Sequence, residues 1–178
     1  MKKPYLTYAL IAEGKLVHID SVANGKECGC FCTYCGEPLQ AKQGAKRKHH
    51  FSHLSGTECE AAYESMLHLL AKEKIQEAFY NRTSLYIEFE YTSFCNQDKC
   101  IFMSHSRRCS NKERKRFDLK TLYDSCEQEI SYDNIRRRSD LKFFSKEFPK
   151  RKPIYIEFCV THASDEAKLH SGNKIIEI

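Results

Sequence analysis

Alternating apolar and polar positions predict most of the elements of this chain. Residues 5–20, YLTYALIAEGKLVHID, alternate on both sides of a Glu-Gly pair, which predicts a β-hairpin that turns at this pair. Residues 84–91, 137–144 and 153–160 alternate in the same way and predict further strands. The final residues, KIIEI, predict a last strand.

One stretch has helical periodicity instead. In residues 60–79 the apolar side chains recur at spacings of three and four, and Thr57 and Glu60 have the spacing of a capping box. The expected buried face consists of Tyr63, Leu67, Leu70, Ala71, Ile75 and Ala78. A shorter helix is expected from Ser164, and residues 94–130 are interpreted as an irregular insert.

Two parts of the chain differ in apolar content. Residues 28–59 are poor in apolar side chains, so this stretch needs an external staple to fold. The elements after it follow the order α, β, β, β, α, β, which is typical of an α/β domain with helices packed on a mixed sheet. We therefore predict an N-terminal hairpin and zinc-finger-like module at residues 1–56, and a second domain at residues 57–178 with its insert at about 94–130.

Composition and charge narrow the class of protein. The chain has 178 residues, a hydrophobic fraction of 41% and a net charge of +5, which suits a folded protein with a mildly basic surface. Its apolar runs are too short to span a bilayer, and no cleavage site follows the N-terminal lysines. We expect a cytoplasmic protein, in which ten cysteines indicate metal binding rather than disulfides.

The strongest metal-binding pattern is CTYC followed by HHFSH. Cys32 and Cys35 are separated by two residues, and His53 with His50 or His49 completes a four-ligand set typical of Zn²⁺. A tetrahedral site of this kind leaves no open position, so its predicted role is structural.

The other cysteines leave alternatives open. Cys28 and Cys30 lie near enough in sequence to replace either histidine, and a reduced loop or thiol chemistry at C-x-x-C is the alternative to zinc. Cys126, Cys159 and Cys59 are interpreted as small buried apolar residues. The cysteines of the insert match no metal-binding spacing and are interpreted as buried or unpaired thiols, with a second zinc site as the alternative. They are Cys95, Cys100, Cys109 and Cys126.

Acidic residues recur on three of the predicted elements. Glu64, His68 and Lys72 form a polar stripe along the long helix. Considered without the strands, this stripe indicates a solvent-exposed face of the helix. Asp140 and Glu157 lie in two strands that are expected to pair, so their carboxylates come close together. Two carboxylates 4 Å apart repel by about 4 kcal/mol at an effective dielectric constant near 20. Such a pair is stable when it shares a proton or holds a divalent cation.

In this order, CTYCG with HHFSH, ESMLHLLAK, RSDLKFF and IYIEFCVTH resemble the competence protein CoiA-like family, over roughly residues 5–178. The resemblance implies a restriction-endonuclease-like mixed sheet flanked by helices, as in PD-(D/E)XK nucleases, with a small N-terminal zinc-stapled module. Carried over by position, Glu64 comes from the helix and Asp140 from a β-hairpin, and Glu157 is the acid of the E-x-K element. Asp140 and Glu157 would bind Mg²⁺ or Mn²⁺.

The chain departs from this pattern at Cys159, where the E-x-K element has lysine. An amine from another element would have to replace it, and we rank Lys168 and Lys72 ahead of Lys142. His68 lies on the same helical stripe and joins the predicted catalytic set.

Two further residues compete for roles at this centre. Asp118, in KRFDLK, is the rival of Asp140, which we prefer because it lies nearer to Glu157 in sequence. His162 either contacts phosphate or metal, or only closes the strand.

Basic clusters favour DNA as the partner. They are Arg107–Arg108, Lys112–Arg116 and Arg136–Arg138. We expect a Mg²⁺-dependent endodeoxyribonuclease in DNA processing or defence against foreign DNA, compatible with a homodimer or a partner protein. The alternatives are an inactive nuclease-fold module that binds nucleic acid or assembles with a partner, and a zinc-stapled regulatory domain.

Overall fold

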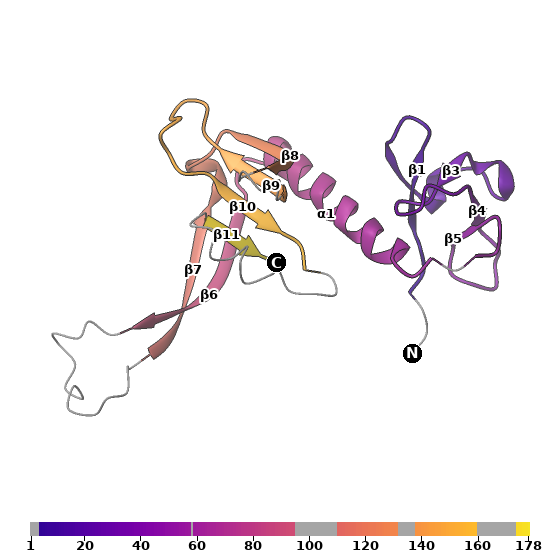
Figure 1. Cartoon of the computed structure of the whole chain (residues 1–178), viewed down its shortest axis with the longest axis horizontal. Helices are drawn as coiled ribbons and strands as arrows, with labels where there is room; N and C mark the ends of the chain where they lie inside the picture. The colour runs from indigo at the N-terminus through magenta and orange to yellow at the C-terminus, as the bar shows by residue number, and fades with distance from the viewer. Residues whose placement is uncertain (1–3, 58, 95–109, 132–137, 160–173) are drawn as a thin grey trace.

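Figure 1 presents a computed structural model that describes residues 4–57, 59–94, 110–131, 138–159 and 174–178. These residues are mostly β, with several small sheets and a 20-residue helix. The strands and the helix have the bounds β1 (Tyr8–Ile11), β2 (Leu16–His18), β3 (Cys30–Phe31), β4 (Leu39–Lys42), β5 (His50–His53), α1 (Ala62–Asn81), β6 (Tyr86–Phe94), β7 (Ser110–Asp118), β8 (Ser125–Ser131), β9 (Arg138–Phe144), β10 (Ile154–Glu157) and β11 (Lys174–Glu177).

Two small antiparallel sheets form the first part of the chain. β1 pairs with β2 and β3, and Gly14 turns the chain between β1 and β2 with a φ of 75°, which glycine adopts without strain. The hairpin predicted over residues 5–20 is therefore confirmed. β4 and β5 form a second hairpin. The core beneath them consists of Ala9, Ile19, Cys30, Cys32, Leu39, Ala41, Phe51 and Ala62.

Helix α1 starts later than its sequence predicts. Its N-cap is Ala61, whose side chain makes no capping hydrogen bond. The predicted capping box is wrong, because the Thr57 hydroxyl lies 2.7 Å from the Ser55 hydroxyl instead.

The two ends of α1 pack on different partners, as Figure 1 shows. Near its start, the Met66 sulfur accepts a hydrogen bond from the Tyr8 amide at 3.3 Å, and near its end the Phe79 and Phe143 ring centroids are 5.1 Å apart. A single apolar stripe therefore does not describe the helix. All six residues of the predicted buried face are only partly buried, and of these Ile75 packs against the second core. The buried side chains of α1 are Ala62, Met66, Lys72 and Phe79.

A four-stranded mixed sheet in the order β11-β10-β9-β8 forms the second part. β10 runs parallel to β11, and the other neighbours are antiparallel. The strands predicted at residues 137–144 and at the final KIIEI are confirmed, whereas β10 ends at Glu157, earlier than predicted. The core of this part consists of Phe79, Ile87, Leu119, Tyr123, Cys126, Leu141, Phe143, Ile154 and Ile156.

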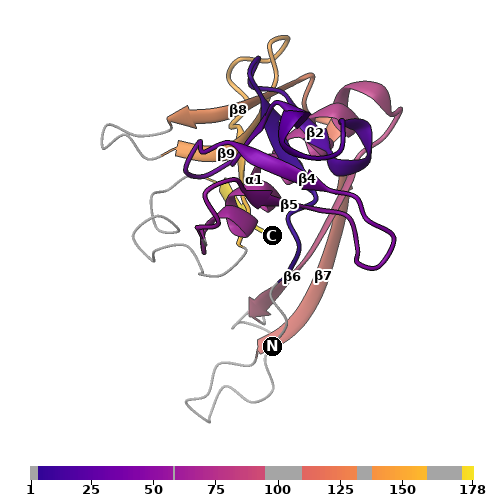
Figure 2. The same cartoon turned by 90° about the vertical axis from the view of Figure 1, so that its right-hand side faces the viewer.

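The insert is more regular than expected. Its described residues contain β7 and β8, so the irregular interpretation of residues 94–130 is wrong there. β6 and β7 form a two-stranded ribbon that extends away from the mixed sheet, as Figures 1 and 2 show from two sides.

The predicted fold class is confirmed in its coarser features. A mixed sheet with a helix against it is present, but the described residues are mostly β rather than α/β. The helix predicted from Ser164 lies outside the described residues. The division between residues 56 and 57 stays a prediction, with one core cluster on each side of α1.

Candidate metal sites

Three cysteines and one histidine converge at the base of the first part. They are Cys32, Cys35, His53 and Cys59, and their sulfur and nitrogen ligand atoms all lie within 4.8 Å of one another. The Cys35 sulfur lies 3.3 Å from His53 Nε2. A Cys₃His set is a familiar ligand set for structural Zn²⁺, so the cluster is consistent with the predicted zinc staple.

Local turns bring these ligands together. The Gly36 amide donates a hydrogen bond to the Cys32 carbonyl at 3.1 Å, which closes the turn that carries Cys32 and Cys35. His53 is the last residue of β5, and Cys59 lies just before α1. Burial, and then the neighbouring Cys32 and Cys35 sulfurs, raise the pKa of Cys59 to about 11.

The fourth ligand differs from the one predicted. The cluster contains Cys59, whereas His50 is turned elsewhere, with Nδ1 2.8 Å from the Lys48 carbonyl and its ring stacked on Tyr5. The alternate, His49, lies 2.6 Å from Asp20. The choice of His50 or His49 is therefore corrected to Cys59.

The other described cysteines lie outside this cluster. Cys126 is buried in the second core, and burial raises its pKa to about 12, as expected of a structural thiol. Cys159 is exposed, so its interpretation as a buried residue is wrong. Cys28 and Cys30 make hydrogen bonds to backbone carbonyls. The remaining insert cysteines, Cys95, Cys100 and Cys109, fall outside the described residues.

Asp140 and Glu157 lie on adjacent strands. β9 and β10 pair with Leu141 opposite Ile156, so one further step of this register sets Asp140 opposite Glu157. Opposite residues of antiparallel strands point to the same face. The Phe158 amide donates a hydrogen bond to Asp140 Oδ2 at 2.9 Å, and the Glu157 side chain is 6% exposed.

Asp140 and Glu157 form a row of acidic residues across the sheet, and further carboxylates lie on both neighbouring strands. Glu177 of β11 is the register partner of Glu157. Glu129 of β8 lies between the residues that pair with Leu141 and Ser139, with a φ of 55° that is uncommon for a residue other than glycine, and its carboxylate shares the Lys72 ammonium with Asp140. Four carboxylates therefore occupy one row across the sheet, where like charges on neighbouring strands destabilise the pairing unless cations offset them.

Helix α1 brings cations to this row. His68 Nδ1 lies 3.6 Å from Asp140 Oδ2, and the Lys72 ammonium lies 3.9 Å from Asp140 Oδ1. Lys72 also pairs with Glu129, while Glu64 lies 3.9 Å from His68 Nε2. The polar stripe of the helix therefore faces the sheet, and Lys72 is only 4% exposed.

Other predicted site residues lie elsewhere or outside the described part. Asp118 accepts hydrogen bonds from the Leu85 and Lys120 amides, so it closes a turn after β7. The Lys142 ammonium lies over the Phe144 ring, 4.7 Å from its centroid. Lys168 and His162 are outside the described residues.

Sequence reasoning missed three residues of these sites. Cys59 follows His53 with five residues between them, a spacing found in zinc sites, and was missed because His49 and His50 lie nearer to His53. Glu129 and Glu177 could have been found by extending the row of Asp140 and Glu157 once the strand order was known. The alternation in SCEQEIS, residues 125–131, was the available sign of the strand that carries Glu129.

The basic clusters are described in part. On β7, Arg114 pairs with Glu88 at 3.3 Å and with Glu90 at 2.9 Å, so acidic neighbours offset some of the Lys112–Arg116 charge. Arg138 lies 3.9 Å from Glu129. Residues 107–108 and 136–137 lie outside the described part. Within the described ranges, none of the helices is long and apolar enough to cross a membrane.

The fold and the cluster define a small β module, held by a Cys₃His set and joined by one helix to a mixed sheet. Residues 16–62 of this chain match the family model of the competence protein CoiA N-terminal domain. All four ligands of the cluster lie in the matched segment, and the resemblance predicted from the sequence is confirmed there. No curated protein and no solved structure matches the chain.

Proposed function

We propose that this protein is a metal-dependent nuclease that hydrolyses phosphodiester bonds of DNA in the cytoplasm, in DNA processing or defence against foreign DNA. The observation that carries the proposal is the register of β9 and β10, which sets Asp140 opposite Glu157. These carboxylates lie beside a helix that contributes a histidine and a buried lysine. A mixed sheet with a helix against it also supports a restriction-endonuclease-like core.

Asp140 and Glu157 are the residues that would hold Mg²⁺ or Mn²⁺. Both are hard oxygen ligands, and the carboxylate row needs positive charge to offset its repulsion. When bound, such a cation polarises the phosphoryl group and lowers the pKa of an attacking water. The Phe158 amide fixes the orientation of the Asp140 carboxylate, which pre-organises one ligand.

Lys72 is our choice for the amine that position 159 lacks. Its ammonium is buried between Asp140 and Glu129, where it can offset charge on a bound phosphate. Cys159 has no amine, and Lys142 is turned over Phe144. His68 and Glu64 extend the same polar stripe and orient Asp140 from the helix side.

Cleavage by charge-removing variants tests the proposal. Asp140→Asn and Glu157→Gln preserve side-chain size, and each should slow cleavage of plasmid and single-stranded DNA with Mn²⁺ or Mg²⁺ by about 100-fold or more. Glu127→Gln removes an exposed carboxylate of β8 and is the matched control, with expected wild-type activity. Wild-type cleavage rates in both site variants would contradict the proposal.

A second function has one specific observation in its favour. Cys159 stands where the nuclease pattern has lysine, as expected for a module that kept the fold and the nucleic-acid binding but lost the chemistry. This alternative predicts DNA binding that is unchanged in Asp140→Asn and no cleavage with any divalent cation. The Zn²⁺ cluster is structural under both functions, since its four ligands leave no open position.

A further inference from the structure

The β4–β5 hairpin concentrates positive charge. Residues 38–57 contain no Asp or Glu, and their four cations are exposed at or near the hairpin tip. These cations are Lys42, Lys46, Arg47 and Lys48. None of the four forms an ion pair with another described residue, so their charge is available to a partner.

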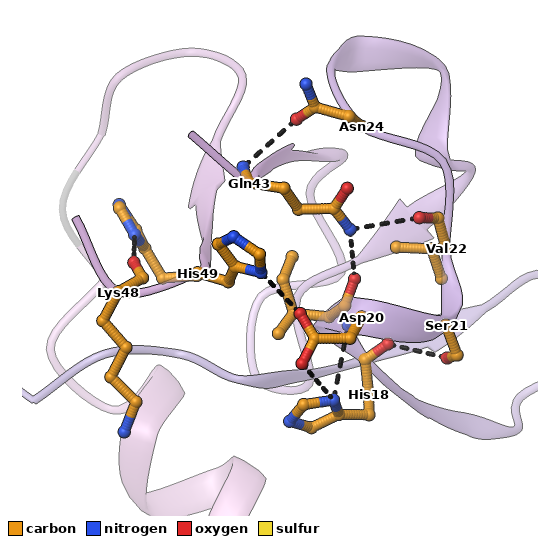
Figure 3. A network of polar contacts seen from close by, with 10 residues as sticks. His18, Asp20, Ser21, Val22, Asn24, Gln43, Lys48 and His49 are labelled. Atoms are coloured by element: carbon orange, nitrogen blue, oxygen red, sulfur yellow. Dashed lines mark hydrogen bonds and ion pairs between the residues drawn. The ribbon is translucent and has the colours of Figure 1, made fainter. Parts of the chain in front are cut away.

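The hairpin tip is held in place at both of its ends, as Figure 3 shows. The Gln43 amide donates a hydrogen bond to Asn24 Oδ1 at 3.1 Å, and His49 Nδ1 lies 2.6 Å from Asp20 Oδ1. The Lys48 side chain extends away from this network. A fixed loop loses less conformational entropy on binding than a free one, which favours recognition of a partner.

A cavity of about 670 Å³ lies between this hairpin and the first turns of α1. Its walls include Tyr5, whose ring packs at a tilt against His50 with centroids 4.7 Å apart, and Tyr63 of the helix. Lys42 lies on the hairpin side and Glu64 on the helix side. The volume is in the range of small-ligand sites, and a nucleotide is of this size. Because Glu64 also borders His68, the cavity adjoins the proposed catalytic centre.

We propose that the β4–β5 hairpin and this cavity bind a nucleic-acid strand. The four hairpin cations contact phosphates, and the aromatic walls stack on a base. Cations alone would also suit an anionic membrane, but an aromatic cavity lined by Lys42, on the same hairpin as the other three cations, fits a nucleic acid better. The inference deepens the proposed function and rests on it for the substrate class, because it names the surface that holds the strand.

Charge-matched variants test the phosphate contacts. The triple variant Lys46→Gln, Arg47→Gln, Lys48→Gln is compared with Lys146→Gln, Lys150→Gln, Lys152→Gln, which removes the same charge from the exposed loop between β9 and β10. The probe is a labelled single-stranded oligonucleotide of about 20 nucleotides, followed by fluorescence anisotropy without added divalent cation. The hairpin variant should bind about 30-fold more weakly, with a salt slope reduced by about two, and the control should change less than about threefold.

Equal losses in the two triple variants would overturn the inference, because the effect would then come from net charge alone. It would also be overturned if the hairpin variant bound the oligonucleotide normally but lost binding to anionic phospholipid vesicles. Unchanged zinc content and melting temperature in both variants establish that they are folded.

Tyrosine variants test the stacking wall. Tyr5→Ala should weaken oligonucleotide binding by about tenfold with an unchanged salt slope, because stacking involves no counterion release. Tyr34→Ala removes an exposed tyrosine of the same module and should bind normally. Normal binding by Tyr5→Ala would overturn the assignment of the cavity.

The two proposals fail in different ways. If the wild type binds DNA through the hairpin but never cleaves it, the nuclease proposal falls and the hairpin inference stands. If the wild type cleaves DNA and the hairpin variant binds and cleaves equally well, the hairpin inference falls and the nuclease proposal stands.

Discussion

At the scale of single residues, Cys59 is the fourth ligand of the candidate zinc cluster. It completes the cluster of Cys32, Cys35 and His53 from the segment just before α1, so a metal bound there would link the β hairpins to the start of the helix. A zinc ion at this position would add to the apolar contacts that already join Ala62 of α1 to the core of the first part.

The ligand correction has a direct test. Cys59→Ser should lower the zinc affinity by about tenfold or more and reduce the bound zinc after dialysis, because one thiolate ligand is lost. His50→Ala should retain wild-type zinc, since its ring lies outside the cluster. The measurement is the metal content of purified protein. Zinc lost from His50→Ala and retained by Cys59→Ser would show that the sequence interpretation was right.

Lys72 is the second residue with a defined consequence. The Lys72 ammonium is buried between two carboxylates. Lys72→Met should therefore slow cleavage and make the net charge around Asp140 more negative. A more negative site binds cations better, and we expect Mn²⁺ affinity to rise by about fivefold to tenfold while cleavage falls by about 100-fold. Calorimetry and a cleavage assay measure the two effects separately. Weaker Mn²⁺ binding in this variant would argue that Lys72 has only a structural role.

At the scale of elements, Asp124 ties the start of β8 to the turn after β9. Its carboxylate accepts hydrogen bonds from the Lys146 amide at 3.0 Å and from the Ser125 and Ser145 hydroxyls at 2.7 Å. These bonds, first of all that from the Lys146 amide, lower the pKa of Asp124 well below its ordinary value. The folded protein therefore favours the ionised form of the Asp124 carboxyl group.

This shift predicts a pH dependence of stability. Because the folded-state pKa is depressed, the contribution of Asp124 is fully present above its unfolded pKa and is lost as the pH falls through the folded pKa. Asp124→Asn should melt at a lower temperature than wild type near pH 7, and the difference should shrink below about pH 4. Thermal melts across this range measure it. A difference that is constant with pH would refute the assignment.

The strands were easier to predict from the sequence than the helix packing and the strand order. The hairpin of residues 5–20 and the strand at residues 137–144 were predicted, because their alternation reflects one buried face. The buried face of α1 was not, since its two ends contact different cores and its middle buries Lys72. For the site, pairing of β9 with β10 was predictable from their patterns, but the row that adds Glu129 depends on a strand order that periodicity does not reveal.

At the scale of the whole molecule, α1 connects the module that carries the Cys₃His cluster to a sheet with its own core. Removal of zinc should therefore act locally. Chelation should speed amide hydrogen exchange in residues 16–62, while β8, β9 and β10 remain protected by their hydrophobic core. Hydrogen exchange followed by mass spectrometry measures both regions at once. Equal loss of protection in the sheet would mean that the two parts fold as one unit.

The central claim is that Asp140 and Glu157 together hold a divalent cation. Crystals soaked in Mn²⁺ and measured at the manganese absorption edge test it most directly. We expect an anomalous peak within bonding distance of both carboxylates, about 2.0–2.3 Å from their oxygens, that disappears in Glu157→Gln. Cleavage-competent protein whose manganese lies elsewhere, with no peak at this pair, would contradict it.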